Sequence, residues 1–166
     1  MNKPQKLNKG DKIAIVSLSR GLLGMPFCKH ELDIAIRRLK EFGLEPVIMP
    51  NALKDMKYIE EHPEARASDL KAAFMDDSIK AIITAIGGID TYKTIPYLME
   101  DPEFIEAVRN NPKIFTGFSD TTNNHLMFQI HVFLCVTLLV YQLLLVHNFF
   151  YRYTILGLIL FHMILQ

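Results

Sequence analysis

The charged residues of this chain stop at Asp120. All 18 acidic residues lie at or before that position, and of the 18 Lys and Arg residues only Arg152 follows Lys113. Up to about residue 129 the mixture of charged and apolar residues is typical of a soluble domain, whereas residues 130–166 are almost unbroken apolar sequence. One water-soluble fold therefore accounts for residues 1–129 only, and the apolar tail needs an interpretation of its own.

In residues 1–129, short apolar runs alternate with segments of helical periodicity. The runs are typical of strands buried on both faces and lie at 12–18, 45–49, 79–85 and 113–118. The periodic segments predict helices at 29–42, 63–75, 91–99, 102–108 and 119–129. This alternation predicts an α/β three-layer sandwich with a mainly parallel sheet, followed by an apolar helical tail. Sites in such sheets form at the carboxyl ends of the strands, here in the loops Ser17–Gly24, Ile86–Asp90 and Gly117–Asp120.

The sequence Gly-Phe-Ser-Asp at 117–120 places Ser119 at a sharp junction between a predicted strand and a predicted helix. A catalytic serine uses such a turn, because it lifts the hydroxyl away from the backbone and aims the next N–H group at a developing oxyanion. The pattern is not G-x-S-x-G, so the motif alone is a weak signal. The alternative is structural, with Ser119 capping the helix and Asp120 favoured by the helix dipole.

Gly87 and Gly88 follow the third predicted strand. Their backbone N–H groups are candidates for the other half of an oxyanion hole. The alternative is a tight turn that needs glycine for positive φ.

Several kinds of site lack their sequence signals. The chain has no G-x-G-x-x-G or P-loop motif, no C-x-x-C pair and no metal-binding histidine spacing, so we predict neither a cofactor nor a metal. No basic run indicates nucleic-acid binding, and no secretory signal opens the chain, so we expect a cytoplasmic protein. A base for Ser119 is also missing, because His125, six residues later, lies on a different face of the predicted helix.

Four segments resemble one family of serine peptidases, the LD-carboxypeptidases and microcin C immunity peptidases. The segments are GDKIAIVSLS (10–19), ARASDLKAAFMD (65–76), IGGIDTYKTIPYL (86–98) and KIFTGFSDTTNNHLMF (113–128). They occur in the order and spacing of the family, over about residues 7–129. The Ile-Gly-Gly opening of the third segment, in place of Arg-Gly-Gly, is more similar to the immunity branch.

The resemblance implies that residues 1–129 are a flavodoxin-like or class I amidotransferase-like N-terminal domain. It implies that Ser119 is the nucleophile and that the backbone N–H groups of Asp120 and Gly88 form the oxyanion hole. The implied substrate is a small peptide, a peptidoglycan fragment or a peptidyl-nucleotide, cleaved at an amide bond, and the family suggests a homodimer.

The triad Glu and His of this family lie in a C-terminal catalytic domain that has no counterpart here. No acidic residue follows Asp120, and none of the histidines in the tail matches the family's histidine. A serine hydroxyl without a base is a weak nucleophile. We therefore expect a truncated chain that is inactive by itself.

The apolar tail has two interpretations. Residues 126–146 are long enough to cross a bilayer, which would make the protein a membrane-anchored, non-enzymatic α/β module. However, residues 130–166 contain no alanine and a single glycine, Gly157, whereas natural spans use small residues freely. We therefore favour a frameshifted tail over a membrane anchor.

Overall fold

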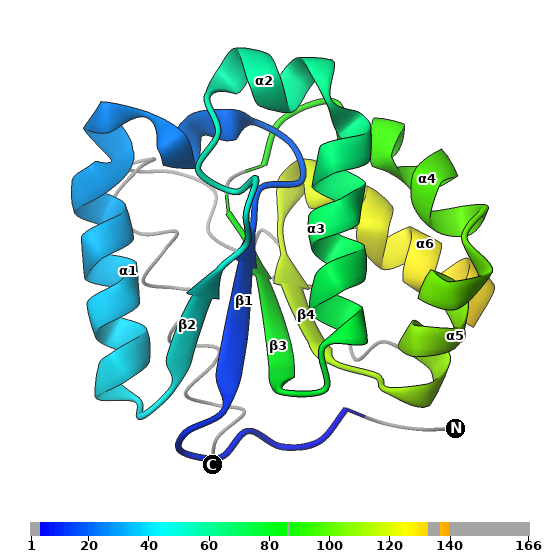
Figure 1. The fold of residues 1–166 in the computed structure, drawn as a ribbon, viewed down its shortest axis with the longest axis horizontal. Coiled ribbons are helices and arrows are strands. Elements are labelled where there is room, and N and C mark those ends of the chain that lie inside the picture. The colour runs from blue at the N-terminus through cyan, green and yellow to red at the C-terminus, as the bar shows by residue number, and fades with distance from the viewer. Residues whose placement is uncertain (1–3, 86, 133–136, 140–166) are drawn as a thin grey trace.

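The computed structural model describes residues 4–85, 87–132 and 137–139. Its strands are β1 (Lys12–Val16), β2 (Glu45–Ile48), β3 (Ile79–Thr84), β4 (Ile114–Gly117) and β5 (Thr137–Leu139). Its α-helices are α1 (Lys29–Glu41), α2 (Met56–Glu61), α3 (Pro63–Met75), α4 (Ile95–Met99), α5 (Pro102–Asn110) and α6 (Thr122–Val132). Four 3-10 helices complete the described elements: η1 (Gly21–Gly24), η2 (Pro26–Cys28), η3 (Thr91–Thr94) and η4 (Ser119–Thr121). Strands and helices alternate (Figure 1), which confirms the predicted α/β fold.

The strands form one parallel sheet in the order β2-β1-β3-β4-β5. Ala14 of β1 pairs with Val47 of β2 and with Ile82 of β3, so the first strand lies inside the sheet. This order is that of flavodoxin-like folds, in which the chain reverses the direction of sheet growth between β1 and β3. The loops after β1, β3 and β4 therefore lie side by side at one edge, as the sequence predicted.

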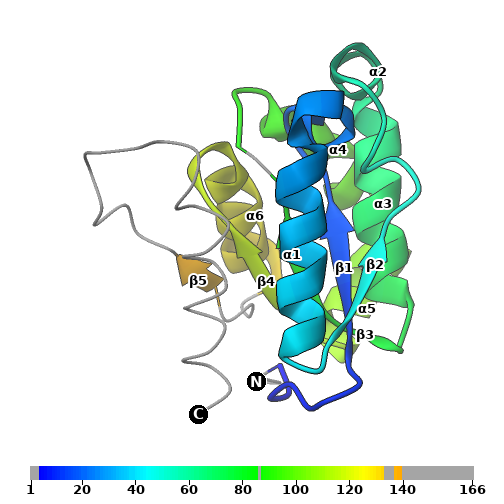
Figure 2. The same ribbon diagram turned by 90° about the vertical axis from the view of Figure 1, so that its left-hand side faces the viewer.

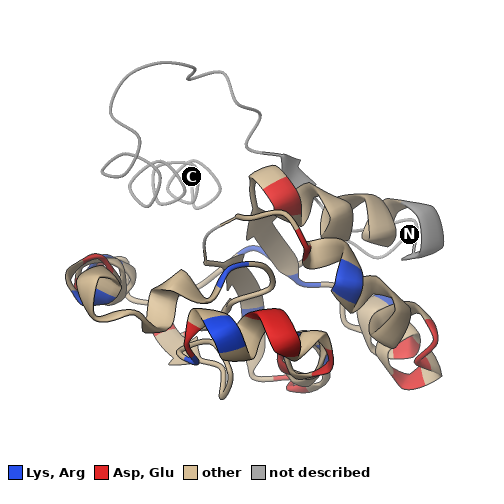
Figure 3. Cartoon of the chain, turned by 90° about the horizontal axis from the view of Figure 1, so that it is seen from above, with Lys and Arg blue, Asp and Glu red and all other residues tan. Residues whose placement is uncertain are grey.

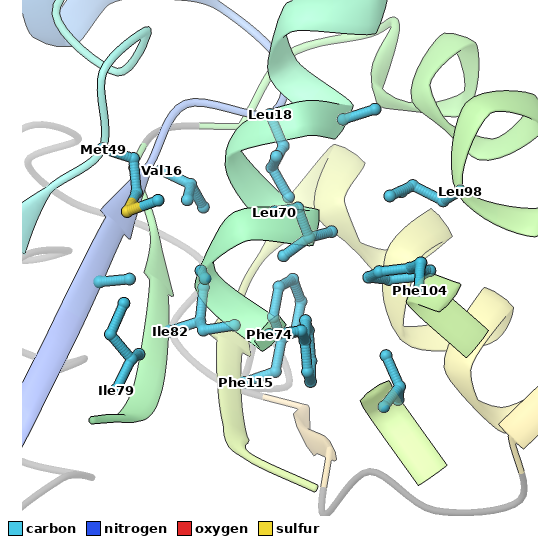
Figure 4. Close-up of a cluster of buried hydrophobic side chains, with 14 of the residues drawn as sticks. Val16, Leu18, Met49, Leu70, Phe74, Ile79, Ile82, Leu98, Phe104 and Phe115 are labelled. Atoms are coloured by element: carbon cyan, nitrogen blue, oxygen red, sulfur yellow. The ribbon is translucent and has the colours of Figure 1, made fainter. Parts of the chain in front are cut away.

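Hydrophobic side chains pack on both faces of the sheet. Ala14 and Val16 of β1 face the larger core, whereas Ile13 and Ile15 face a smaller one, as strand geometry requires. Figure 2 shows α1 and α3 on either side of β1. The larger core is built mainly from α3, α4, α5 and α6 and contains Leu70, Phe74, Leu98, Phe104 and Phe115 (Figure 4). The smaller core includes Leu39 of α1.

The end of α1 follows directly from its sequence. Gly43 has φ +79°, a conformation that costs glycine little. The N–H of Gly43 donates to the Lys40 carbonyl at 2.9 Å, and the N–H of Leu44 donates to the Leu39 carbonyl at 3.0 Å. These two bonds satisfy the last carbonyls of the helix in a Schellman motif, which ends α1 within one residue of the predicted bound at 42.

Lys113, next to the start of β4, has a buried ammonium group. The residue is 1% exposed, and its Nζ donates to the backbone carbonyls of Ala73, at 2.8 Å, and of Asp76, at the end of α3. Burial lowers the pKa of Lys113 to about 8, although the carboxylates of Asp76 and Asp77 oppose this shift. Lys113 thus connects β4 to the end of α3 through its ammonium group. Burial disfavours the charged form of this group.

We expect this lysine to make the chain more stable as the pH rises from about 8 to 10.5. Folded Lys113 loses its proton near pH 8, whereas the unfolded chain keeps it to about 10.5, so the penalty for burying the charge disappears between these values. Relative to Lys113→Met, the free energy of unfolding of the wild type should rise by roughly 3 kcal/mol over this window. Urea unfolding across this window measures the difference. Lys29→Met, which removes an exposed ammonium 2.8 Å from Asp33 on α1, is the control and should show no such rise.

The start of the apolar tail differs from the sequence prediction. The apolar helical tail expected after residue 129 is wrong at Thr137–Leu139, because α6 ends at Val132 and these residues form β5. Strand β5 pairs in parallel with β4, whose free edge offers backbone partners at that point. In the part of the chain that the structure describes, no helix is long and apolar enough to span a bilayer. Residues 140–166 lie outside the described residues, so the structure does not test the frameshift hypothesis for them.

Candidate active site

Ser119 lies where the chain turns from β4 into a helix. Phe118 is extended, with φ −150° and ψ 167°, and Ser119 follows with φ +55°. Among the described residues, Ser119 is the one non-glycine with positive φ, and its side chain is exposed. This strained conformation at a strand-to-helix turn is the geometry of a nucleophile elbow. The N-cap of η4 is Phe118 and no side chain caps that helix, so the structural alternative for Ser119 as a cap is not observed.

The glycine pair after β3 packs against this turn. A Cβ added to Gly87 would lie 2.9 Å from the Ser119 Cβ and 3.3 Å from its Oγ, so the backbone of Gly87 is in close contact with the serine. A Cβ on Gly88 would overlap the Oγ of Ser19. Gly88 does not have positive φ. Close approach of neighbouring residues, rather than the tight turn considered above, is therefore the reason for glycine at position 88.

The carboxylate of Asp120 joins three loops. Its Oδ2 accepts hydrogen bonds from the Ser19 hydroxyl at 2.6 Å, the Thr91 hydroxyl at 2.6 Å and the Thr91 N–H at 2.8 Å. Its Oδ1 accepts from the Asn123 amide at 3.1 Å. Burial by itself would raise the pKa of Asp120, but the bonds from Ser19 and Thr91 together outweigh it and hold this pKa below its ordinary value. The Asp120 side chain is thus an ionised acceptor that links the ends of β1, β3 and β4.

A buried arginine fixes two of the same loops. Arg66 on α3 is 0% exposed, and its guanidinium contacts both carboxylate oxygens of Asp90, at 3.0 and 3.3 Å. The same group donates to the backbone carbonyls of Leu18, at 3.0 Å, and Ser19, at 3.3 Å. Lys93 also approaches Asp90, at 3.4 Å. The Arg66 guanidinium therefore binds both the loop after β1 and the loop after β3.

His125 does not act on Ser119 in this structure. Its ring is 1% exposed and packs edge-on against Phe115, with 5.0 Å between ring centroids. Burial lowers the pKa of His125, with a smaller opposing effect from the Gly117 backbone, and neither ring nitrogen has a regular hydrogen bond among the described residues. This position agrees with the expectation that His125 is a poor base for Ser119.

Ser19, Arg66, Asp90 and Thr91 were not identified as site residues from the sequence. The signal for Arg66 was a charged residue on the inner face of a helix whose neighbours Ala67, Leu70 and Phe74 are core residues.

Seen from above the carboxyl edge, basic and acidic residues are interspersed (Figure 3). Within residues 4–85, 87–132 and 137–139, no group of three or more His, Cys, Asp or Glu could hold a metal.

Comparisons with known proteins agree on one family. Residues 13–138 match the LD-carboxypeptidase N-terminal domain of the S66 peptidases, so the match continues past residue 129 into β5. A Bacillus subtilis protein named "Probable murein peptide carboxypeptidase" is 35% identical over 124 residues, which are 74% of this chain and 35% of that protein. A MccF-like protein from Streptococcus pneumoniae, solved in complex with AMP, is 52% identical with a TM-score of 0.68, over 72% of this chain and 34% of its own.

A second solved structure is the microcin C7 self-immunity protein MccF in complex with aspartyl sulfamoyl adenosine. It is 26% identical with a TM-score of 0.64, over 74% of this chain and 34% of its own. The chain spans about a third of the length of the curated relatives it matches. With the fold, the Ser119 turn and the match over residues 13–138 in agreement, the chain belongs to the LD-carboxypeptidase family of S66 peptidases.

Proposed function

We propose that this chain carries the nucleophile of a serine carboxypeptidase that hydrolyses an amide bond in a small peptide or peptidyl-nucleotide. The observation that supports this most is the exposed Ser119, held at φ +55° between β4 and α6. A serine in this conformation presents its hydroxyl at the carboxyl edge of the sheet, where substrates of parallel α/β folds bind.

The reaction would be acyl transfer to Ser119. The Ser119 Oγ attacks the carbonyl carbon of the amide and gives its proton to a base, and the backbone N–H groups of Asp120 and Gly88 stabilise the oxyanion. The amine then leaves with a proton from the same base, and water hydrolyses the acyl-enzyme.

The base would have to come from outside the described residues. His125 is buried against Phe115, and no acidic residue follows Asp120 to orient another histidine. In the family that the chain belongs to, as the resemblance implies, the Glu and His of the triad lie in a C-terminal domain. We propose that residues 1–129 belong to the nucleophile domain and that the frameshifted tail starts later than predicted, after residue 138, where the family match ends. We also propose that the 166 residues alone turn over little substrate.

A peptidyl-nucleotide is the substrate class that the comparisons favour. Identity is 52% to the Streptococcus pneumoniae protein that binds AMP, against 35% to the Bacillus subtilis murein relative. The Ile-Gly-Gly sequence at residues 86–88 favours the same branch.

Hydrolysis with an added base tests the proposal. The chain is incubated with an aminoacyl-nucleotide amide and with a murein tetrapeptide, with and without imidazole as external base. We expect no turnover without imidazole, slow turnover of the nucleotide substrate with it, and none in Ser119→Ala. Turnover that persists in Ser119→Ala would contradict the role of Ser119. Turnover by the wild type without imidazole would contradict the proposal that this chain supplies no base for Ser119.

Gly87→Ala should lower the reactivity of Ser119. The added methyl group would lie 2.9 Å from the Ser119 Cβ, so the serine or the loop has to move. We expect roughly a tenfold lower rate of labelling of Ser119 by a fluorophosphonate, because small displacements of a nucleophile cost large factors in rate. Ile89→Ala, in the same loop at a side chain 79% exposed, is the control and should leave the rate unchanged. Equal rates in the two variants would show that Gly87 does not constrain Ser119.

A further inference from the structure

The hydrogen bonds of the Asp120 side chain have a role that the proposed reaction does not use. We propose that Asp120, Ser19 and Thr91 form a clamp, here named the Asp120 clamp, whose side chains hold Ser119 in its positive-φ conformation. The proposal rests on the proposed function of Ser119 as nucleophile. It makes Ser19 and Thr91 positioning residues, because their hydroxyl groups act on Ser119 through Asp120.

Three donors converge on one carboxylate oxygen. The Ser19 and Thr91 hydroxyls and the Thr91 N–H reach Oδ2 of Asp120 at 2.6, 2.6 and 2.8 Å. Both donor residues are buried, Ser19 at 1% and Thr91 at 0% exposed, so water does not compete freely for the carboxylate. Hydrogen bonds to an ionised acceptor are stronger than those between neutral groups. The Asp120 side chain is therefore fixed at a point set by the loops after β1 and β3.

The fixed side chain of Asp120 belongs to the residue that follows the strained Ser119. Asp120 follows Ser119 directly, so holding its side chain limits the rotation of the peptide that joins the two residues. On the other side of Ser119, the Phe118 carbonyl accepts bonds from the Thr121 hydroxyl at 2.9 Å and the Thr121 N–H at 3.2 Å. Ser119 is thus enclosed between two anchored residues. Strained conformations persist where the surroundings determine them in this way.

The donors of the clamp are themselves held in place. Arg66 binds the backbone carbonyl of Ser19 and the carboxylate of Asp90, which adjoins Thr91. Gly88 leaves the space that the Ser19 Oγ occupies, since a Cβ there would overlap it. The clamp therefore needs no rearrangement of the loops to form, and removing one hydroxyl should weaken it without unfolding the site.

Two variants that each remove one hydroxyl test the clamp, each with a matched control. Ser19→Ala and Thr91→Val each delete one hydroxyl donor to Asp120, while the Thr91 N–H remains. Ser17→Ala deletes a buried hydroxyl that binds the Ala52 carbonyl at 2.8 Å, and Ser68→Ala deletes an exposed one on α3 that binds the Ala65 carbonyl at 2.9 Å. The first measurement is the set of NMR scalar couplings of Ser119 that report its φ. The second is the rate at which a fluorophosphonate labels Ser119, with thermal unfolding as a check on the fold.

We expect Ser19→Ala and Thr91→Val to lose the positive-φ couplings of Ser119 and to be labelled roughly tenfold more slowly. The two controls should keep both values. Retention of positive φ in both variants and in the double variant would overturn the clamp, and so would an equal loss in the controls. If the wild type is not labelled at Ser119, the nucleophile role fails, while the couplings still decide whether the clamp holds Ser119.

Discussion

Arg66→Met should be one of the most destabilising single substitutions in this chain, at roughly 3 kcal/mol of unfolding free energy. The guanidinium is fully buried and binds both carboxylate oxygens of Asp90 and two backbone carbonyls after β1. Methionine has a similar length but no donor, so the Asp90 carboxylate and the carbonyls of Leu18 and Ser19 lose their buried partner. Lys93, at 3.4 Å from Asp90, compensates only in part because it lies closer to the surface.

Urea unfolding of the whole chain measures this cost. Arg66→Lys keeps the charge but loses the planar fork, so we expect an intermediate loss. Arg38→Met removes an exposed ion pair with Glu41 and should change the free energy of unfolding by less than about 0.5 kcal/mol. A loss below about 1 kcal/mol in Arg66→Met would show that Arg66 does not hold the two loops together.

Phe128→Ala should cost about 3 to 4 kcal/mol of unfolding free energy. Phe128 on α6 is 0% exposed and contacts three other rings, with centroid distances of 5.0 Å to Phe115, 5.4 Å to Phe74 and 6.3 Å to Phe104. Alanine would leave a cavity between β4, α3 and α5, which the surrounding helices fill only in part. The helix that starts just after Ser119 is held by this ring, so labelling of Ser119 should fall as well.

Leu126→Ala is the control on the same helix. Leu126 is 49% exposed, and its removal should cost less than about 0.5 kcal/mol. Chemical unfolding monitored by circular dichroism compares the two variants. Equal costs would mean that α6 does not pack through Phe128 as described.

The sequence predicted the parts of the fold that depend on local pattern. Alternating apolar runs and helical periodicity predicted four of the five strands, and the helices predicted at 29–42 and 63–75 match α1 and α3 to within one residue. Helix α2 was missed because it is only six residues long, although Asp55 caps it by accepting from the Tyr58 N–H at 2.9 Å. Strand β5 was missed because it lies in a uniformly apolar segment. In such a segment, the spacing of hydrophobic residues cannot distinguish a strand from a helix.

The candidate site was predictable only where a short stretch of sequence indicates the local geometry. Gly-Phe-Ser-Asp indicated the turn at Ser119, and the structure places a strained serine there. Contacts between Asp120 and Ser19, 101 positions apart, depend on the order of strands in the sheet. The sequence contains no local sign of them, and the same holds for the bond between Arg66 and Asp90.

The most direct test of the central claim is mapping of fluorophosphonate adducts by peptide mass spectrometry. The chain is treated with the reagent in imidazole, and labelling of Ser119 is compared with that of the exposed serines Ser68 and Ser78. We expect Ser119 to be labelled at least roughly tenfold faster than either, because its turn and the adjoining N–H groups favour attack, and we expect no such adduct in Ser119→Ala. Equal labelling of the three serines would contradict the assignment of Ser119 as the nucleophile.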